Sequence, residues 1–236
     1  MREDICTIPI SEVFEPKEGC PICRMRDTLE QRMTEYITGA AMMEPDVREV
    51  TNRTGFCYDH FAMMLKKGSR LSNALILESH LKEVGRQALL LGEKGAPGKK
   101  QLQQAQALSH SCFVCERVEW GMGHLFTTLY HLWQSEEEFR ALYAQQPYFC
   151  LPHYARLMEG AAKGISRKNQ EAFAQATRQV AARYLETLQK DVTHFCSMFD
   201  YRNNGGDFGN SKDAIERSIA FLTSRQVGWN EKDKDN

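Results

Sequence analysis

The sequence predicts an all-α protein made of two tandem helical repeats followed by a C-terminal helix. Three observations support this prediction. Apolar residues recur every three or four positions over most of the chain, which is typical of amphipathic helices. One pattern of cysteines and histidine occurs twice in the same order, which indicates an internal duplication. Turn-forming residues at 95–100 and 203–206 separate the parts. We therefore expect repeats at residues 1–95 and 101–203, and a closing helix and tail within residues 204–236.

The helices are expected at corresponding places in the two repeats. In the first repeat they follow Cys23 and then cover residues 45–51, 58–67 and 72–92. In the second repeat they follow Cys115 and then cover residues 136–145, 151–163 and 169–201. The last helix begins near Ser211, because Ser211 and Asp213 suit a helix N-terminus. Residues 5–10 are expected to form a short extended segment.

The duplicated pattern is a CxxC pair followed at a distance by a CxxH pair. The two pairs are separated by 33 residues in the first repeat and by 34 in the second. A phenylalanine, Phe56 or Phe149, precedes the third cysteine in both repeats. The pattern accounts for six of the eight cysteines and two of the seven histidines, so chance is a poor explanation. Its members are Cys20, Cys23, Cys57 and His60 in the first repeat, and Cys112, Cys115, Cys150 and His153 in the second.

These residue types at this spacing indicate metal binding. Three thiolates and one neutral imidazole satisfy the tetrahedral coordination of a structural zinc ion. Each pair precedes an expected helix, whose exposed amides and positive dipole end favour thiolates. We therefore expect two zinc ions per chain, each held by the CxxC and the CxxH of one repeat. Because protein ligands fill all four positions, this arrangement disfavours hydrolytic catalysis at the ion.

The sequence leaves the pairing of the motifs and the identity of the metal open. A helix from residue 24 to residue 39 is about 24 Å long at 1.5 Å per residue, and the chain must return over that distance to bring Cys57 beside Cys23. An exchanged arrangement, in which the first CxxC meets the second CxxH, is the alternative. The metal could also belong to an iron–sulfur cluster, because histidine replaces cysteine in some of these clusters.

The remaining cysteines and histidines have weaker indications. Cys6 has no partner nearby in the sequence, and Cys196 lies at the edge of an apolar stripe, where a buried thiol is expected. The other histidines are interpreted as hydrogen-bonding residues without an assigned role. They are His80, His110, His124, His131 and His194.

Composition argues against several classes of protein. With 30 basic and 31 acidic residues the formal net charge is −1, whereas general nucleic-acid binders carry a basic surplus. No run reaches the roughly 18 apolar residues of a membrane-spanning helix, and the N-terminus lacks the apolar core of a signal peptide. We therefore expect a cytoplasmic protein, in which paired cysteines hold metal or perform redox chemistry rather than form disulfides.

Taken together, these motifs resemble a family of uncharacterised bacterial proteins. The resemblance rests on the segments CPIC, CYDH, CFVC and CLPH, on FDYRN at residues 199–203, and on the closing KDAIERSIAFLTS, and it extends over nearly the whole chain. It implies importance for the metal ligands and for Asp200, Tyr201 and Arg202, and it implies no reaction. From the residues themselves, Asp200 and Arg202 are expected to clamp the last helix through Lys212, Asp213, Glu216 or Arg217. A polar site beside one metal is the alternative.

The function predicted from these features is that of a metal-stabilised helical protein that acts through protein–protein contacts. The ligand sets are closed, and the sequence contains neither a nucleotide-binding glycine loop nor a recognisable nucleophile triad. The alternative is a redox protein that carries iron–sulfur clusters or a zinc–thiolate switch. The expected partner is another protein or a second copy of this chain. Membrane and nucleic-acid partners are not expected.

Overall fold

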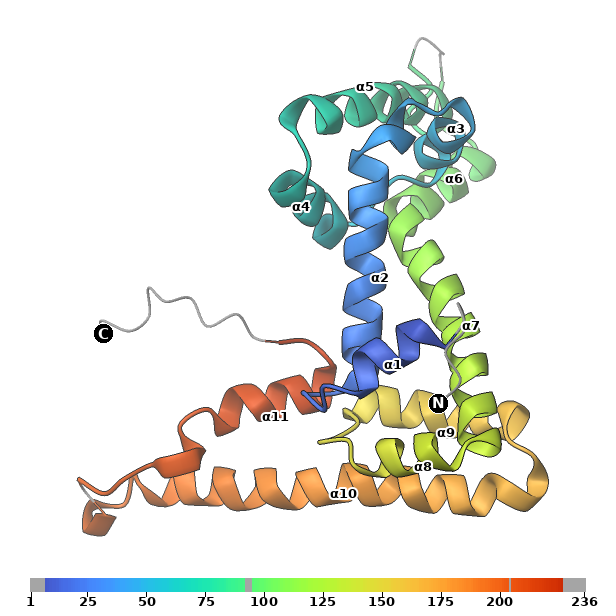
Figure 1. The fold of residues 1–236 in the computed structure, drawn as a ribbon. Coiled ribbons are helices and arrows are strands. Elements are labelled where there is room, and N and C mark those ends of the chain that lie inside the picture. The colour runs from blue at the N-terminus through green and yellow to red at the C-terminus, as the bar shows by residue number, and fades with distance from the viewer. Residues whose placement is uncertain (1–6, 92–94, 204, 227–236) are drawn as a thin grey trace. The chain divides into compact units, whose positions relative to one another are not determined.

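The computed structural model describes residues 7–91, 95–203 and 205–226, and every regular element in these ranges is a helix (Figure 1). This confirms the all-α fold class. The helices form two compact units. The terminal unit comprises residues 1–25 and 124–236, and the central unit comprises residues 26–123.

These compact units differ from the repeats seen in the sequence. The terminal unit takes residues from both the N-terminal and the C-terminal part of the chain, so its bounds cut across the expected parts 1–95, 101–203 and 204–236. Two helices, α2 (Pro21–Thr38) and α7 (Phe113–Ser135), begin in one unit and continue into the other. Each unit therefore contains helices from both repeats.

The terminal unit is built around a cluster of buried aromatic rings. Phe14, Phe139, Tyr143, Phe149 and Phe173 are all fully buried. The ring centroid of Tyr143 lies 4.7 Å from that of Phe149 and 5.7 Å from that of Phe173. Besides parts of α2 and α7, the helices of this unit are α1 (Ile8–Phe14), α8 (Glu137–Ala144), α9 (Leu151–Gly164), α10 (Arg167–Ser197) and α11 (Ala214–Thr223).

The central unit has a smaller core. Of the twelve largest fully buried side chains, only Ile37, Met64 and Met122 belong to it, and the other nine belong to the terminal unit. Helix α5 packs against α3 and α6, and Arg48 donates to the carbonyl oxygen of Leu75 over 3.2 Å. Besides parts of α2 and α7, the helices of this unit are η1 (Ala40–Met43), α3 (Pro45–Thr54), α4 (Tyr58–Lys67), α5 (Arg70–Gln87) and α6 (Lys99–His110).

Most helices lie where the apolar spacing predicts them, and the differences have physical reasons. Helix α1 occupies residues that were expected to be extended; of that segment, residues 5 and 6 lie outside the described ranges. Helix α6 was missed because none of its residues is buried, so it presents no strong apolar stripe. Helix α10 ends at Ser197, and the FDYRN segment forms a short 3₁₀ turn, η2 (Tyr201–Asn203).

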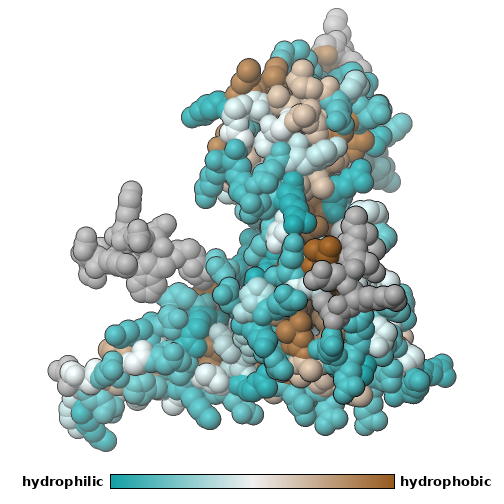
Figure 2. Space-filling view, in the orientation of Figure 1, coloured by the Kyte–Doolittle hydropathy of each residue, from teal (hydrophilic) through white to brown (hydrophobic). Residues whose placement is uncertain are grey.

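Among the described residues, no helix combines the length and the apolar character needed to cross a membrane. Helix α7 has 23 residues, but its first two turns already carry Glu116, Arg117 and Glu119. Hydrophilic residues cover most of the face drawn in Figure 2, with smaller hydrophobic patches between them.

Glycine allows close packing between α7 and α9 in the terminal unit. A Cβ atom on Gly160 would overlap the Tyr130 hydroxyl, which donates to the carbonyl oxygen of Leu157 over 3.1 Å. We expect Gly160→Ala to lower the free energy of unfolding by about 1–3 kcal/mol through overpacking, measured by urea denaturation. In a Tyr130→Phe background, which removes the overlapping oxygen, the loss should shrink clearly. An equal loss in both backgrounds would contradict this packing.

Candidate metal centres

All eight candidate ligands lie at helix N-termini, with the same local geometry. The first residue of each pair directly precedes the helix, and the second is the third residue of the helix. A spacing of three therefore places both side chains on the same exposed helix end, where unpaired amides and the dipole favour negative charge. The pairs are Cys20 and Cys23 at α2, Cys57 and His60 at α4, Cys112 and Cys115 at α7, and Cys150 and His153 at α9.

The structure brings these eight residues together as two clusters. In each cluster the candidate ligand atoms all lie within 4.8 Å of one another. The terminal site, in the terminal unit, consists of Cys20, Cys23, Cys150 and His153. The central site, in the central unit, consists of Cys57, His60, Cys112 and Cys115.

The CxxC of each repeat therefore meets the CxxH of the other repeat. The expected pairing within one repeat is wrong, and the exchanged arrangement is the one that the chain adopts. Helix length explains the exchange. Helix α7 has 23 residues and is about 35 Å long at 1.5 Å per residue. To pair with Cys112 and Cys115, Cys150 would have to lie beside the start of α7. The eight residues of α8 and the loop up to Cys150 would cover that distance only if they ran straight back along α7.

In the terminal site, the imidazole faces all three sulfur atoms. The Nδ1 atom of His153 lies 3.1 Å from Sγ of Cys150, 3.3 Å from Sγ of Cys23 and 3.7 Å from Sγ of Cys20. The sulfurs of Cys23 and Cys150 are 3.6 Å apart. Metal–sulfur bonds of about 2.3 Å in a tetrahedral zinc site place two sulfurs about 3.8 Å apart. The cluster thus has the dimensions of a mononuclear tetrahedral site.

The central site repeats this geometry. The Nδ1 atom of His60 lies 3.1 Å from Sγ of Cys57, 3.3 Å from Sγ of Cys112 and 3.4 Å from Sγ of Cys115. The sulfurs of Cys57 and Cys115 are 3.9 Å apart. In both sites the histidine offers Nδ1, because a residue three positions into the helix reaches back to the cysteine that precedes it. The amide of Cys115 donates to Sγ of Cys112 over 3.5 Å.

Backbone contacts hold the two motifs of the central site together. The amide of Phe113 donates to the carbonyl oxygen of Gly55 over 2.9 Å, and the hydroxyl of Ser111 donates to the carbonyl oxygen of Thr54 over 2.6 Å. Gly55 has a φ of 64°, a left-handed conformation that glycine adopts without strain. It ends α3 and turns the chain toward Cys57.

The terminal site is supported by the loops before its helices. The side-chain amide of Gln146 is buried and donates to the carbonyl oxygen of Phe14 over 2.8 Å. Lys17 donates to Oε1 of Gln145 over 2.6 Å, and Gly19, with a φ of 61°, turns the chain into Cys20. These contacts tie the segment before the CxxC to the segment before the CxxH.

Crowding of the thiols separates their pKa values in the terminal site. Burial raises the pKa of Cys20, but hydrogen bonds with Cys150, Cys23 and His153 outweigh it and bring the pKa well below the usual value. The hydrogen bond to Cys20 raises the pKa of Cys150 to about 12. The hydrogen bond to Cys150 raises the pKa of Cys23 further still. The three thiols therefore differ in pKa because they contact one another.

The central site shows the same division. Burial raises the pKa of Cys112, but hydrogen bonds from His60 and from the amides of Cys115 and Cys57 lower it to about 6. Partial desolvation, together with the neighbouring thiols, raises the pKa values of Cys115 and Cys57. Three thiolates at this distance repel one another, and a divalent cation between them removes that repulsion. The donor set of each cluster therefore fits a metal ion.

Residues outside the two motifs also reach the sites. Oε1 of Glu30 lies 3.9 Å from Nε2 of His60, on the side of the ring away from the sulfurs, where a carboxylate helps to orient a ligating histidine. The Tyr148 hydroxyl lies beside Gly19, which precedes Cys20: a Cβ atom on Gly19 would be 4.0 Å from it. Burial, then Tyr184, and then Cys20, Cys23 and Cys150 raise the pKa of Tyr148. The sequence gives no signal for either residue, because both depend on tertiary packing.

Several other sequence expectations need correction. Cys196 is exposed rather than buried, and Cys6 lies outside the described residues. Asp200 does not clamp the last helix: it accepts a hydrogen bond from the amide of Arg202 over 3.0 Å. The ion pair that joins α10 to α11 is instead formed by Asp191 and Arg217, 3.0 Å apart.

The chain belongs to DUF6062, a family of unknown function whose profile matches residues 1–228. No curated protein and no solved structure matches the chain. The resemblance to an uncharacterised family is thereby confirmed, and it supplies no activity. The two clusters are thus the strongest indication of function that the molecule offers.

The exchanged pairing can be tested by cross-linking. We expect a short bifunctional thiol reagent, applied to native metal-free protein, to join Cys150 to Cys20 or Cys23, and Cys57 to Cys112 or Cys115. The reason is that these sulfurs lie within 4.8 Å of one another. Peptide mapping by mass spectrometry identifies the links, and denatured protein serves as the control. Links between Cys57 and Cys20 or Cys23 would contradict the exchanged arrangement.

Proposed function

We propose that the protein is a non-catalytic helical scaffold in which each compact unit is held together by one zinc ion, and that it acts through contacts with another protein. The observation that carries this proposal is the assembly of two complete Cys₃His clusters, each from helix N-termini that lie far apart in the sequence. Because metal binding joins such distant segments, the binding free energy contributes directly to folding.

The spacing of the ligand atoms supports a single ion in each site. Sulfur–sulfur distances of 3.6 Å and 3.9 Å match ligands that share one tetrahedral centre. The cysteines of an iron–sulfur cluster bind several irons and stand farther apart, so the spacing disfavours that alternative. Thiolate and imidazole donors in a tetrahedral set favour zinc over harder cations.

The closed ligand sets support a structural role rather than a catalytic one. Three sulfurs and one nitrogen already complete a tetrahedron, whereas catalytic zinc sites keep one position for water or substrate. All seven described cysteines are free thiols, which suits a reducing compartment such as the cytoplasm.

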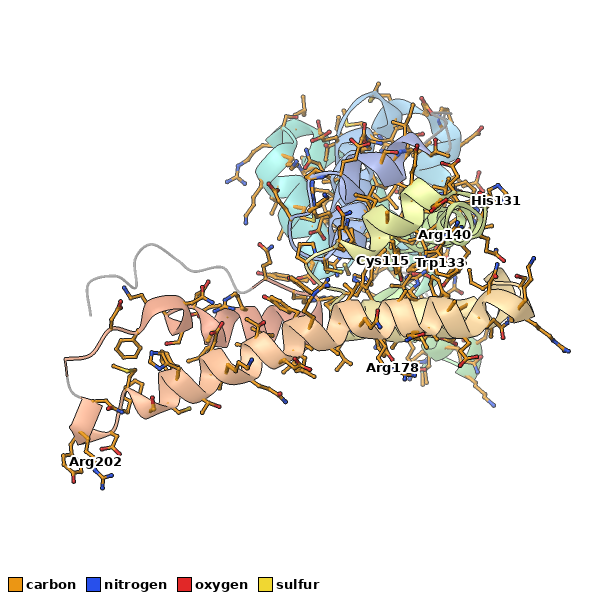
Figure 3. All side chains as sticks on the ribbon, turned by 60° about the horizontal axis from the view of Figure 1, so that its bottom comes forward. Cys115, His131, Trp133, Arg140, Arg178 and Arg202 are labelled. Atoms are coloured by element: carbon orange, nitrogen blue, oxygen red, sulfur yellow. The ribbon has the colours of Figure 1, made fainter. Side chains whose placement is uncertain are left out.

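The end of α10 supports a role in protein contact. Phe199 and Tyr201 are exposed there, at 72% and 81%, and the guanidinium of Arg202 lies 5.4 Å from the centre of the Tyr201 ring. Tyrosine and arginine are enriched at energetically important interface positions. Figure 3 labels Arg202 at the end of this helix.

Metal content tests the structural part of the proposal. We expect two zinc ions per chain in anaerobically purified protein, measured by elemental analysis and native mass spectrometry. The double variant Cys20→Ser/Cys150→Ser removes two ligands of one site and should keep one ion. The matched variant Cys20→Ser/Cys57→Ser damages both sites and should lose both ions.

Thermal unfolding of the same proteins links the ions to the fold. Removal of both ions should lower the melting temperature, and the central unit should melt first because its core is smaller. An unchanged melting curve after verified metal removal would sink the structural role. Two ions lost from Cys20→Ser/Cys150→Ser and one from Cys20→Ser/Cys57→Ser would instead reject the assignment of the ligands.

Site-specific photo-crosslinking tests the contact surface. A photoreactive residue in place of Tyr201 should yield a discrete protein adduct in cells, and Arg202→Ala should reduce the yield because it removes an exposed cation beside that position. Position 178, an exposed arginine on α10 that is also labelled in Figure 3, is the control. Identical adduct patterns at positions 201 and 178, or no adduct at 201, would argue against this surface.

A further inference from the structure

The two metal centres share their ligand geometry but differ in their exposure. Among the eight ligand residues, all of which the structure describes, Cys115 is the only one that is exposed. Its counterpart in the terminal site, Cys23, is partly covered, and Cys20, Cys150 and His153 are buried. The difference must come from residues around the ligands.

Helix α11 and two stacked tyrosines cover the terminal site. The carbonyl oxygen of Ser224, at the end of α11, lies 3.9 Å from Sγ of Cys23. The rings of Tyr148 and Tyr184 stack 4.0 Å apart, and the ring of Phe221 on α11 lies 6.2 Å from Tyr148 and 5.9 Å from Tyr184. This closing helix follows the second repeat and belongs to the terminal unit.

Among the residues that the structure describes, the central site has no counterpart of this cover. The position two residues before the CxxH cysteine is Tyr148 in the second repeat and Gly55 in the first, so the aromatic side chain is missing there. The first repeat is also followed by no helix equivalent to α11: α5 is followed by α6, which packs on α5. Residue Cys115 is accordingly exposed to solvent.

We propose that Cys115 is the metal ligand that peroxide-class oxidants attack first, and that its oxidation releases the metal ion of the central site while the terminal site keeps its ion. This inference rests on the proposed metal binding. Zinc-bound thiolates remain nucleophilic, and exposure decides which of them an oxidant reaches.

The chemistry balances with hydrogen peroxide as the only co-reactant. The thiolate of Cys115 attacks one peroxide oxygen, a sulfur–oxygen bond forms, the oxygen–oxygen bond breaks, and hydroxide leaves. The thiolate of Cys57, whose sulfur lies 3.9 Å away, then attacks the sulfur of Cys115, forms a disulfide and expels a second hydroxide. Two sulfurs lose two electrons, the peroxide gains them, and two protons from solvent complete two waters. The ion retains only Cys112 and His60 and departs.

The test follows metal release and thiol oxidation in the same sample. Full-length holoprotein with Cys6→Ser and Cys196→Ser, which removes the two cysteines outside the clusters, is first shown to contain two zinc ions. Hydrogen peroxide is then added, released zinc is measured with a chromogenic chelator, and trapped thiols are mapped by mass spectrometry. We expect one ion to leave in a fast phase together with a disulfide that contains Cys115. The second ion should leave about tenfold more slowly or slower, since its release requires local opening of the cover.

Two pairs of variants separate exposure from ligand loss. Cys115→His keeps a tetrahedral donor set but removes the exposed sulfur, and it should abolish the fast phase; the matched Cys23→His should leave that phase unchanged. Phe221→Leu loosens the cover of the terminal site and should speed release of the second ion, whereas Leu222→Ala, at an exposed position of the same helix, should not. If a variant fails to fold, the proposal is still tested by the order in which the two zinc ions leave the Cys6→Ser/Cys196→Ser protein and by the disulfides that form in it.

The outcomes distinguish this inference from the proposed function. Fewer than two ions before oxidation would reject the proposed metal sites themselves. Two ions that leave together, or a first disulfide within Cys20, Cys23 and Cys150, would reject the role of Cys115 and leave the metal sites standing. A fast single-ion phase with Cys115 in the disulfide, reversed by a thiol reductant and zinc, supports the proposal.

Discussion

The meeting of two helix N-termini at each Cys₃His cluster is the interaction on which the rest of the structure depends. A spacing of three residues places both ligands of a motif at the start of one helix, so each cluster requires two helix starts to converge. Two positive dipole ends that point at each other repel, and thiolates with a bound cation turn this arrangement into a favourable one. The candidate ligands lie at the starts of α2, α4, α7 and α9, and both helices of a site begin at its cluster.

This constraint also explains why the two repeats exchange their motifs. Helix α2 begins at the terminal site and continues into the central unit, where Thr34 and Ile37 are buried. Helix α7 begins at the central site and continues into the terminal unit, where Leu129 and Trp133 are buried. Each cluster thus lies at the start of a helix that also contributes buried residues to the other unit. Duplication followed by exchange joins the units through two helices instead of one linker.

Much of the fold and the full set of candidate ligands follow from the sequence, because they depend on local patterns. Helix α4 begins and ends where the pattern places it, at Tyr58 and Lys67. The sequence does not predict which CxxH motif each CxxC motif meets, because pairing within a repeat and exchanged pairing use the same residues at the same spacing. The two pairings differ only in whether the short segment between α7 and Cys150 can span the length of α7. That comparison needs the ends of the helices, which the sequence gives only to within a few residues. Glu30 beside His60 and Tyr148 beside the terminal site are products of tertiary packing, which no local pattern records.

Identical ligands do not give the two centres identical chemistry, because the second layer of residues differs. In the terminal site, the end of α11 contacts Cys23, and the stacked rings of Tyr148 and Tyr184 lie beside α11. In the central site, Cys115 is exposed, and Gly55 stands in place of the tyrosine. A duplicated motif keeps its ligands because each one is required for the tetrahedron. Its surroundings are free to diverge, and one copy can remain structural while the other becomes chemically accessible.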